Sequence, residues 1–249
     1  MPATIVSVIN QKGGTGKTTT TINLGSALQK LGKRVLLIDL DPQANLSYSL
    51  GITEPACTLA EVFSGQQKLT DCLQERNGLW VAPGSNELVD IEISLVSQKE
   101  RELFLQYMLR EVEGFDYILI DCPPSLSLLT LNALVASTEV VIPLQMEVLT
   151  LQGLGQILNT VAQIRETLNP NLRVKGIVVV MFDKRRKLSS EIEDYLKENI
   201  DEYIFHQRIR LNVKLAEAPS FGQSVLDYDA SSYGAKDYLG LAKEFVSIS

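Results

Sequence analysis

Cysteine and histidine are scarce in this sequence, and their scarcity argues against several kinds of chemistry. Three cysteines are present, with no Cys-x-x-Cys pair and no spacing typical of a metal site. Their scatter predicts no disulfide framework, fits a reducing cytosol, and argues against an iron–sulfur carrier or nitrogenase-type reductase, which would need paired cysteines at an interface. The only histidine, His206, lies far along the chain from Cys122, so we expect Cys122 to be a packing residue and not a nucleophile.

Long apolar runs and excess positive charge are also missing. No run approaches the ~18 residues needed to span a bilayer, and no signal pattern precedes the apolar segment that begins at residue 4. Acidic residues outnumber basic residues by 30 to 23, so any binding of nucleic acid must use a local patch and not the surface as a whole. What is present, 249 residues of which 45% are hydrophobic, fits one globular domain over residues 1–249.

The strongest motif covers residues 10–19 (NQKGGTGKTT), between an expected strand at 4–9 and an expected helix at 20–31. This is the context of a phosphate-binding loop, in which backbone N–H groups and a helix N-terminus face an anion. Lys17 is placed to neutralise β- and γ-phosphate oxygens, and the Thr18 hydroxyl to bind Mg²⁺. The bland alternative is a glycine-rich turn that binds nothing. We expect the nucleotide-binding residues to include Gly13, Gly14, Thr15, Gly16, Lys17, Thr18 and Thr19.

Two further expected strands end in carboxylates. Residues 33–41 end in Asp39 and Asp41, and residues 115–121 (FDYILID) end in Asp121 in the Walker B arrangement. Ligands of open α/β sheets bind at the carboxyl ends of the strands. We expect Asp121 to hold a Mg²⁺-bound water or to shape the γ-phosphate pocket. Taken alone, Asp39 and Asp41 could merely end a strand and cap the next segment.

Strands alternate with helices along the chain, which predicts an α/β fold with a doubly wound, mostly parallel sheet. Residues 52–115 are less informative. There we expect a short helix at 58–63 with Thr58 as its N-cap, a short strand at 78–84 with Trp80 half-buried, and a charged helical pattern over 87–112. Elsewhere the pattern predicts strands at 139–143 and 174–181 and helices at 126–137, 150–168 and 235–246.

The phosphate loop departs from the ordinary pattern, because Gln11 stands where a glycine is usual and a second lysine, Lys12, follows it. Lys-Gly-Gly-x-Gly-Lys-Thr-Thr resembles the deviant Walker A signature of the ParA/MinD branch of P-loop ATPases. The resemblance continues at 39–45 (DLDPQAN, switch I), 121–125 (DCPPS, switch II) and 215–222 (LAEAPSFG). The chain most resembles the short, Soj-type ParA proteins and is also similar to the carboxysome-positioning ATPases (McdA).

This resemblance implies a homodimer that closes around ATP and Mg²⁺, with residues 147–153 in the interface. By the same resemblance Lys12 reaches the partner's ATP, Asp41 positions or activates the attacking water, and Asp39 lies near the Mg²⁺ hydration shell. Pro219, in the 215–222 loop, would lie beside the adenine. The implied catalytic residues are Lys12, Lys17 and Asp41, and the implied metal-site residues are Thr18, Asp39 and Asp121.

Two basic stretches, residues 183–187 and 204–216, are the candidates for contact with nucleic acid. In the ParA family basic residues in these two regions hold DNA phosphates across the ATP dimer, which implies sequence-independent, salt-sensitive binding of double-stranded DNA. From charge alone, both stretches have a structural explanation: one is a solvent-exposed loop, and in the other the charges keep an edge strand from pairing with another chain. Residues 227–234 (DYDASSYG) lack the arginines that the family often has there, which weakens one expected contact. The candidates are Lys184, Arg185, Arg186, Lys187, Arg208, Arg210 and Lys214.

The resemblance also implies a ParB-like or McdB-like adaptor that stimulates hydrolysis, and a location in the cytoplasm on the nucleoid. The main alternative is a MinD-like membrane-associated positioning ATPase, which shares the nucleotide motifs. It would need a basic amphipathic C-terminal helix, whereas the segment 240–249 is short and carries one lysine. A ligase of the dethiobiotin synthetase type and a non-hydrolysing, nucleotide-gated scaffold are further alternatives.

Overall fold

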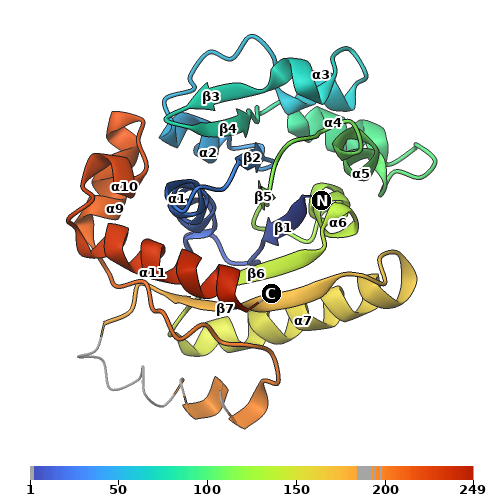
Figure 1. The fold of residues 1–249 in the computed structure, drawn as a ribbon. Helices are drawn as coiled ribbons and strands as arrows, with labels where there is room; N and C mark the ends of the chain where they lie inside the picture. The colour runs from blue at the N-terminus through green and yellow to red at the C-terminus, as the bar shows by residue number, and fades with distance from the viewer. Residues whose placement is uncertain (1–2, 184–191, 193, 197, 249) are drawn as a thin grey trace.

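A mostly parallel sheet forms the centre of the computed structural model, which describes residues 3–183, 192, 194–196 and 198–248 (Figure 1). Within these residues the sheet has seven strands in the order β3-β4-β2-β5-β1-β6-β7, and only β3 runs antiparallel to its neighbour. The predicted fold class is confirmed. The strands are β1 (Thr4–Val8), β2 (Val35–Asp39), β3 (Gln74–Arg76), β4 (Leu79–Ala82), β5 (Tyr117–Asp121), β6 (Glu139–Gln145) and β7 (Arg173–Val180).

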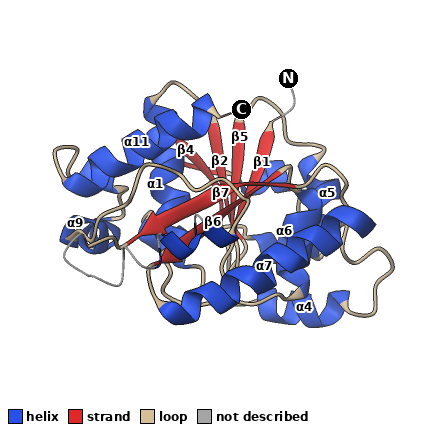
Figure 2. Ribbon diagram, turned by 90° about the horizontal axis from the view of Figure 1, so that it is seen from below, coloured by secondary structure: helices blue, strands red, loops and turns tan. Residues whose placement is uncertain are grey.

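Helices cover both faces of the sheet, as Figure 2 shows. Alternate residues of β2 enter different cores: Leu36 and Ile38 face one cluster, and Val35 and Leu37 face the other. Such double burial explains why the parallel strands are continuous apolar runs. The first core contains residues of α3 (Leu59–Phe63), α4 (Leu88–Leu95), α5 (Phe104–Leu109), α6 (Leu128–Ala136) and α7 (Val148–Thr167). The second contains residues of α1 (Lys17–Lys30), α2 (Asn45–Ser49), α10 (Val225–Tyr228) and α11 (Tyr233–Ser247).

The segment between β2 and β5 differs most from expectation. The helical pattern over 87–112 is interrupted, because Glu100 adopts a left-handed φ of 53° between α4 and α5. The strand expected at 78–84 is the second strand of a hairpin, β3–β4, that turns at Asn77 and Gly78 with φ of 53° and 81°. Asn-Gly is the preferred pair for such a turn. The predicted N-cap is confirmed: Thr58 and Glu61 form a complete capping box on α3.

The expectation that the cysteines form no disulfide is wrong. Cys57 and Cys72 are paired, with Cα atoms 5.1 Å apart. Cys57 precedes the N-cap of α3, and Cys72 ends the 3₁₀ helix η1 (Leu69–Cys72), so the turn of the chain after α3 brings the two together. Spacing in sequence carries no information about this distance. Cys122 is the free cysteine and is fully buried.

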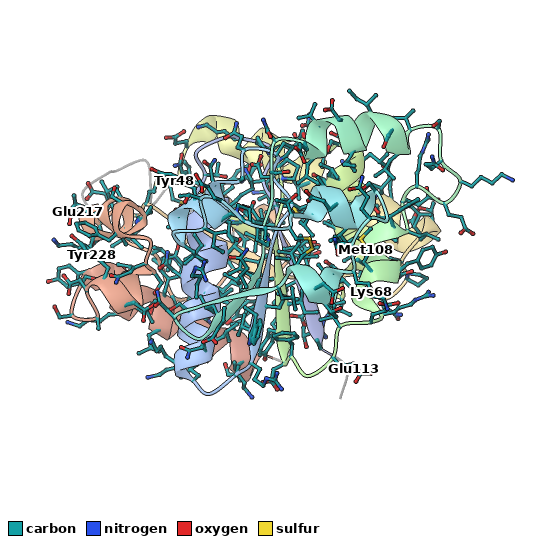
Figure 3. The ribbon with its side chains drawn as sticks, turned by 90° about the horizontal axis from the view of Figure 1, so that it is seen from above. Tyr48, Lys68, Met108, Glu113, Glu217 and Tyr228 are labelled. Carbon is teal, nitrogen blue, oxygen red and sulfur yellow. A yellow bond between two sulfur atoms is a disulfide. The ribbon has the colours of Figure 1, made fainter. Side chains whose placement is uncertain are left out.

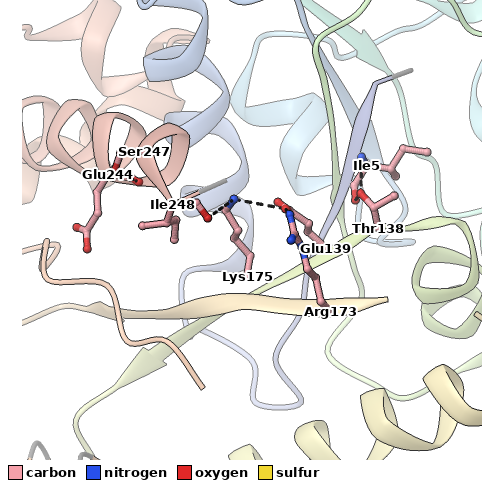
Figure 4. A network of polar contacts seen from close by, with 8 residues as sticks. All are labelled: Ile5, Thr138, Glu139, Arg173, Lys175, Glu244, Ser247 and Ile248. Carbon is pink, nitrogen blue, oxygen red and sulfur yellow. Dashed lines mark hydrogen bonds and ion pairs between the residues drawn. The ribbon is translucent and has the colours of Figure 1, made fainter. Parts of the chain in front are cut away.

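A buried ion cluster joins the last helix to the sheet at the edge where β6 begins (Figure 4). The Glu139 carboxylate contacts Arg173 at 2.5 Å and Lys175 at 3.3 Å. Lys175 Nζ also donates to the carbonyl of Ile248, 3.4 Å away, and lies 4.9 Å from the centre of the Phe245 ring. The cluster therefore fixes the end of α11, which packs along α1. In the described part of the chain, no helix combines the length and apolarity that crossing a membrane requires.

Candidate nucleotide-binding site

The glycine-rich loop leads from β1 into α1 in a conformation that favours glycine. Gly14 and Gly16 have φ of 74° and 78°, and Gly16 is the N-cap of α1. A Cβ atom on Gly13 or Gly14 would meet nothing within 4 Å, so this side of the loop is open. The first N–H groups of α1 lack helical acceptors and add the positive end of the helix dipole. The loop can therefore receive an anion such as a phosphate.

Two polar side chains that the sequence analysis missed hold this loop against β6. Asn10 Nδ2 donates to the carbonyl of Pro143 at 2.7 Å, and Asn10 Oδ1 accepts from the Lys12 N–H at 3.0 Å. Gln145 Nε2 donates to the carbonyl of Gly14 at 3.0 Å. Asn10 is the first residue of the 10–19 motif, although no role was assigned to it, whereas nothing in the sequence marks Gln145.

The two lysines of the loop have different surroundings. Lys17 is buried, and its Nζ lies 3.5 Å from the carbonyl of Lys12. Burial lowers the pKa of the Lys17 ammonium, and the nearby carboxylates of Asp121 and Asp41 oppose this effect. Lys12 instead extends outward, and its Nζ lies 2.6 Å from Oε2 of Glu147, directly before α7. Both side chains of that ion pair are nearly half exposed.

Two carboxylates meet at the ends of adjacent strands, because Asp39 of β2 is in register with Asp121 of β5. Both are fully buried. Burial raises the pKa of Asp39 to about 7, and burial together with the Asp39 charge raises the pKa of Asp121 well above its usual range. Asp121 accepts hydrogen bonds from the Thr18 hydroxyl at 2.6 Å and the Thr21 hydroxyl at 3.4 Å.

These residues fit a hydrated Mg²⁺ ion. Oδ1 of Asp39 is buried and has no partner among the described residues, and the Thr18 hydroxyl stands beside Asp121. Hard oxygen donors of this kind suit Mg²⁺, which keeps several waters and shares phosphate oxygens. The described residues contain no group of three or more His, Cys, Asp or Glu that could hold a metal without such help.

A cavity of about 360 Å³ brings the loop together with both switch segments. Asp41 lines it together with Lys17 and Thr18, and Pro124 comes from the segment after β5. Asp41 is nearly buried, and its Oδ1 accepts the N–H of Gln43 at 3.0 Å. Cys122, next to Asp121, is unsuited to nucleophilic chemistry, because burial raises the pKa of its thiol far above the usual range. Packing is the role that its surroundings support.

A second, smaller cavity of about 160 Å³ adjoins the first, and Gly16, Thr19 and Met181 line both. Its walls are mainly apolar, with Val180, Ile209 and Leu215 among them, so it has the size and character for a planar base. Leu215 and Ala216 belong to the loop expected beside the adenine. Pro219 lies further on, in the 3₁₀ helix η2 (Ala218–Phe221).

The candidate DNA-binding residues fall into two groups. Lys184, Arg185, Arg186 and Lys187 lie outside the described residues. Arg210 instead forms a two-pronged contact with Asp237, at 2.6 Å and 2.9 Å, and stacks 4.1 Å from the centre of the Tyr233 ring.

The remaining two candidates are also engaged within the subunit. Lys214 pairs with Glu217 at 2.8 Å, and Glu217 accepts the Tyr228 hydroxyl; both Glu217 and Tyr228 are labelled in Figure 3. Arg208 donates to the carbonyls of Phe205 and His206.

Residues 3–174 match a protein family described as "AAA domain". The chain is 42% identical to the "Chromosome partitioning protein ParA" of Caulobacter vibrioides, with 99% of this chain and 95% of that protein covered. It is also 42% identical to the "Sporulation initiation inhibitor protein Soj" of Bacillus subtilis, covering 96% of this chain and 97% of that protein.

Solved structures agree in fold. Cobyrinic acid a,c-diamide synthase from Mycobacterium smegmatis, with bound ATP analog and magnesium, matches with a TM-score of 0.85 at 33% identity, covering 97% of this chain and 93% of that one. An ATP complex of Cyanothece McdA matches with a TM-score of 0.88 over 100% of this chain and 98% of that one, but its 23% identity shows the fold alone. Since its curated relatives match over nearly their whole length, the chain belongs to the ParA/Soj family of P-loop ATPases with a deviant Walker A motif.

Proposed function

We propose that this chain is a Mg²⁺-dependent ATPase that dimerises around ATP, binds DNA in that state and partitions a DNA cargo. The observation that carries the proposal is the opposite placement of two lysines in one phosphate loop. Lys17 is buried beside the cavity, whereas Lys12 points out of its own subunit's site toward Glu147. A lysine that reaches out of its own site is available to the phosphates of a nucleotide bound by a second subunit.

In the proposed site, Lys17 and the N–H groups that open α1 neutralise the terminal phosphates. Thr18, Asp121 and Asp39 would hold Mg²⁺ and its water shell, and the ion when bound would neutralise phosphate charge and orient the leaving group. Asp41, which lines the same cavity, accepts a hydrogen bond from the attacking water and aims it at the γ-phosphorus. Among the described residues that line this cavity Asp41 is the only carboxylate, which fits slow hydrolysis that a partner accelerates.

Dimerisation follows from charge. Two nucleotides facing each other across an interface repel, and Lys12 of each subunit offsets that repulsion when it moves from Glu147 to the partner's phosphates. ATP thereby becomes part of the interface. DNA affinity that depends on the dimer is then coupled to nucleotide state.

Basic residues at 184–187 are the main DNA contacts in this proposal. Arg208, Arg210 and Lys214 bond to groups of their own subunit, so they contribute less unless the dimer rearranges them. Binding of this kind is independent of sequence and weakens steeply with salt. It would place the protein in the cytoplasm, on the nucleoid.

The name of one relative, "Chromosome partitioning protein ParA", favours a chromosome as cargo, with a plasmid as the related alternative. Membership of the ParA/Soj family implies a ParB-like adaptor as partner. The likeness to McdA extends to the fold alone, so a carboxysome cargo with an McdB-like adaptor is the weaker form of the proposal. A MinD-like membrane role is less compatible with α11, because its apolar residues Tyr238, Leu241 and Phe245 are buried against the rest of the chain. Co-sedimentation with DNA and with anionic liposomes separates the two.

The deciding experiment is Lys12→Ala, measured by light scattering with ATP and with a non-hydrolysable analogue. We expect the wild-type chain to double its mass with nucleotide and Lys12→Ala to stay monomeric while still binding ATP. Lys33→Ala, a lysine on the turn between α1 and β2, is the matched control and should dimerise normally. An unchanged mass shift in Lys12→Ala would overturn the proposal.

A further inference from the structure

Ser47, which no motif of the sequence analysis included, links three elements behind the candidate site. Its N–H and its hydroxyl both donate to Oδ2 of Asp39, at 2.8 Å and 2.6 Å. The same hydroxyl oxygen accepts the N–H of Gly84 at 3.1 Å. The side chains of Ser47 and Asp39 are fully buried. One serine thus joins α2, the end of β2 and the turn after β4.

The hydrogen bonds from Ser47 to Asp39 close a loop that contains Asp41. Residues 40–46 run from Asp39 to Ser47, and both ends of this loop meet at the Asp39 carboxylate. Inside it, the Ala44 N–H donates to the Asp41 carbonyl at 2.9 Å, and Ala44 holds a left-handed φ of 51°. Such a conformation is strained for alanine and persists only where its surroundings enforce it. The bonds from Ser47 to Asp39 supply part of that enforcement.

Gly84 shows how closely the three residues fit. A Cβ atom built there would lie 2.5 Å from the carbonyl oxygen of Asp39 and 3.0 Å from its carboxyl carbon. Backbone at this position can approach Asp39 only if the residue is glycine. The contact leaves Asp39 little room to shift, and Ser47 occupies one of its two carboxylate oxygens.

We propose that Ser47 is a positioning residue for ATP hydrolysis. By occupying Oδ2 it leaves Oδ1 of Asp39 as the oxygen available to the metal's water shell, and by closing the 40–46 loop it fixes Asp41 relative to Lys17 and Thr18. Ser47 itself is buried and is not among the residues that line the nucleotide cavity. This inference rests on the proposed function, because it assigns Ser47 to the hydrolytic step of the same site.

The test compares Ser47→Ala with wild type in phosphate release, in ATP KM and in the analogue-driven mass shift. Because the serine acts on the loop that presents Asp41, kcat should fall about tenfold or more, whereas KM and dimerisation should change less than about twofold. Ser47→Thr keeps the hydroxyl and should restore at least half of the wild-type kcat. Ser94→Ala, which removes an exposed serine hydroxyl bonded to a backbone carbonyl on α4, is the control and should leave all three unchanged.

The outcomes separate this inference from the proposed function. If wild type neither dimerises nor releases phosphate, the proposed function fails. If wild type does both and Ser47→Ala keeps its full kcat, or loses ATP binding in parallel with kcat, the positioning role is overturned. If Ser47→Ala does not fold, Ser47→Cys, with a similar size and a weaker donor, should show the same split between kcat and KM, and its absence overturns the role.

Discussion

Both edges of the sheet bury carboxylates, one where β6 begins and two where β2 and β5 end, but the charges are compensated differently. Where β6 begins, Glu139 has Arg173 and Lys175 against it. Where β2 and β5 end, Asp39 and Asp121 lie side by side, and both pKa values are raised by burial. Each edge has one buried carboxylate oxygen without a partner among the described residues, so an orphan oxygen alone does not identify a site.

Among the described residues, direct ion pairs with cations are found at Glu139 and not at Asp39 or Asp121, and this is what distinguishes the two edges. A buried acid held by cations of the same chain is a structural joint, and removing one partner leaves an uncompensated charge. Buried acids that repel each other are maintained at a cost in stability, which is typical of functional sites that await a cation or substrate.

Lys175→Met should have the largest effect on stability, because it removes the buried cation of the structural edge. The free energy of unfolding should fall by about 2–4 kcal/mol, measured by urea denaturation, while ATP-analogue affinity measured below the melting range stays unchanged. Arg173→Met is the matched control and should cost clearly less, because the Arg173 side chain is 61% exposed. Equal losses for both variants would break the comparison.

Asp39→Asn, at the edge where β2 and β5 end, should instead raise the free energy of unfolding of the nucleotide-free protein. Burial raises the pKa of Asp39 from 3.8 in an unfolded chain to about 7, so its contribution to stability is present at low pH and is lost as pH rises through this window. At pH 8 the variant should gain roughly 1–3 kcal/mol over wild type, and the gain should shrink toward pH 4.

Urea denaturation at pH 8 and pH 5 measures this difference, with the exposed Asp71→Asn as the control. The same Asp39 variant should need more Mg²⁺ for half-maximal ATPase activity. A gain that does not vary with pH would contradict the account of Asp39.

Arg210→Ala should give the smallest change in DNA binding. Its guanidinium is compensated by Asp237 just as Glu139 is compensated by its two cations. We expect DNA retention at low salt to change less than about twofold, whereas Arg185→Glu combined with Arg186→Glu should reduce it by about tenfold or more. Filter binding over a salt series measures both. A large, salt-dependent loss in Arg210→Ala would mean that the pair with Asp237 opens on DNA.

The sequence was sufficient for the parallel strands and for the position of the phosphate loop between a strand and a helix, because both depend on local patterns. Apolar runs predicted the parallel strands, and strand-end carboxylates predicted that Asp39 and Asp121 lie at one edge, which the register confirms. Local patterns carry less information about partners that are distant in sequence. Asp237 lies 27 residues from Arg210, so its role in holding that arginine could not be foreseen.

The segment between β2 and β5 shows the same limit. The helical pattern over 87–112 was too long, because the left-handed Glu100 divides it, and no apolar period predicts that turn. The partnership of Cys57 and Cys72 depends on where α3 directs the chain. Ser47 follows the recognised switch I residues by two positions, but only the fold shows that it returns to Asp39.

The ion pair between Lys12 and Glu147 has a consequence for how readily two subunits associate. Because both side chains are nearly half exposed, water and salt screen their attraction, and breaking it costs less than about 1 kcal/mol. Each pair that opens would lower the equilibrium constant for pairing of subunits by no more than about fivefold, and two pairs open in each dimer, so the fall would be no more than about thirtyfold. The ion pair is thus weak: it keeps Lys12 within reach of an incoming subunit and opposes association of the two subunits only slightly.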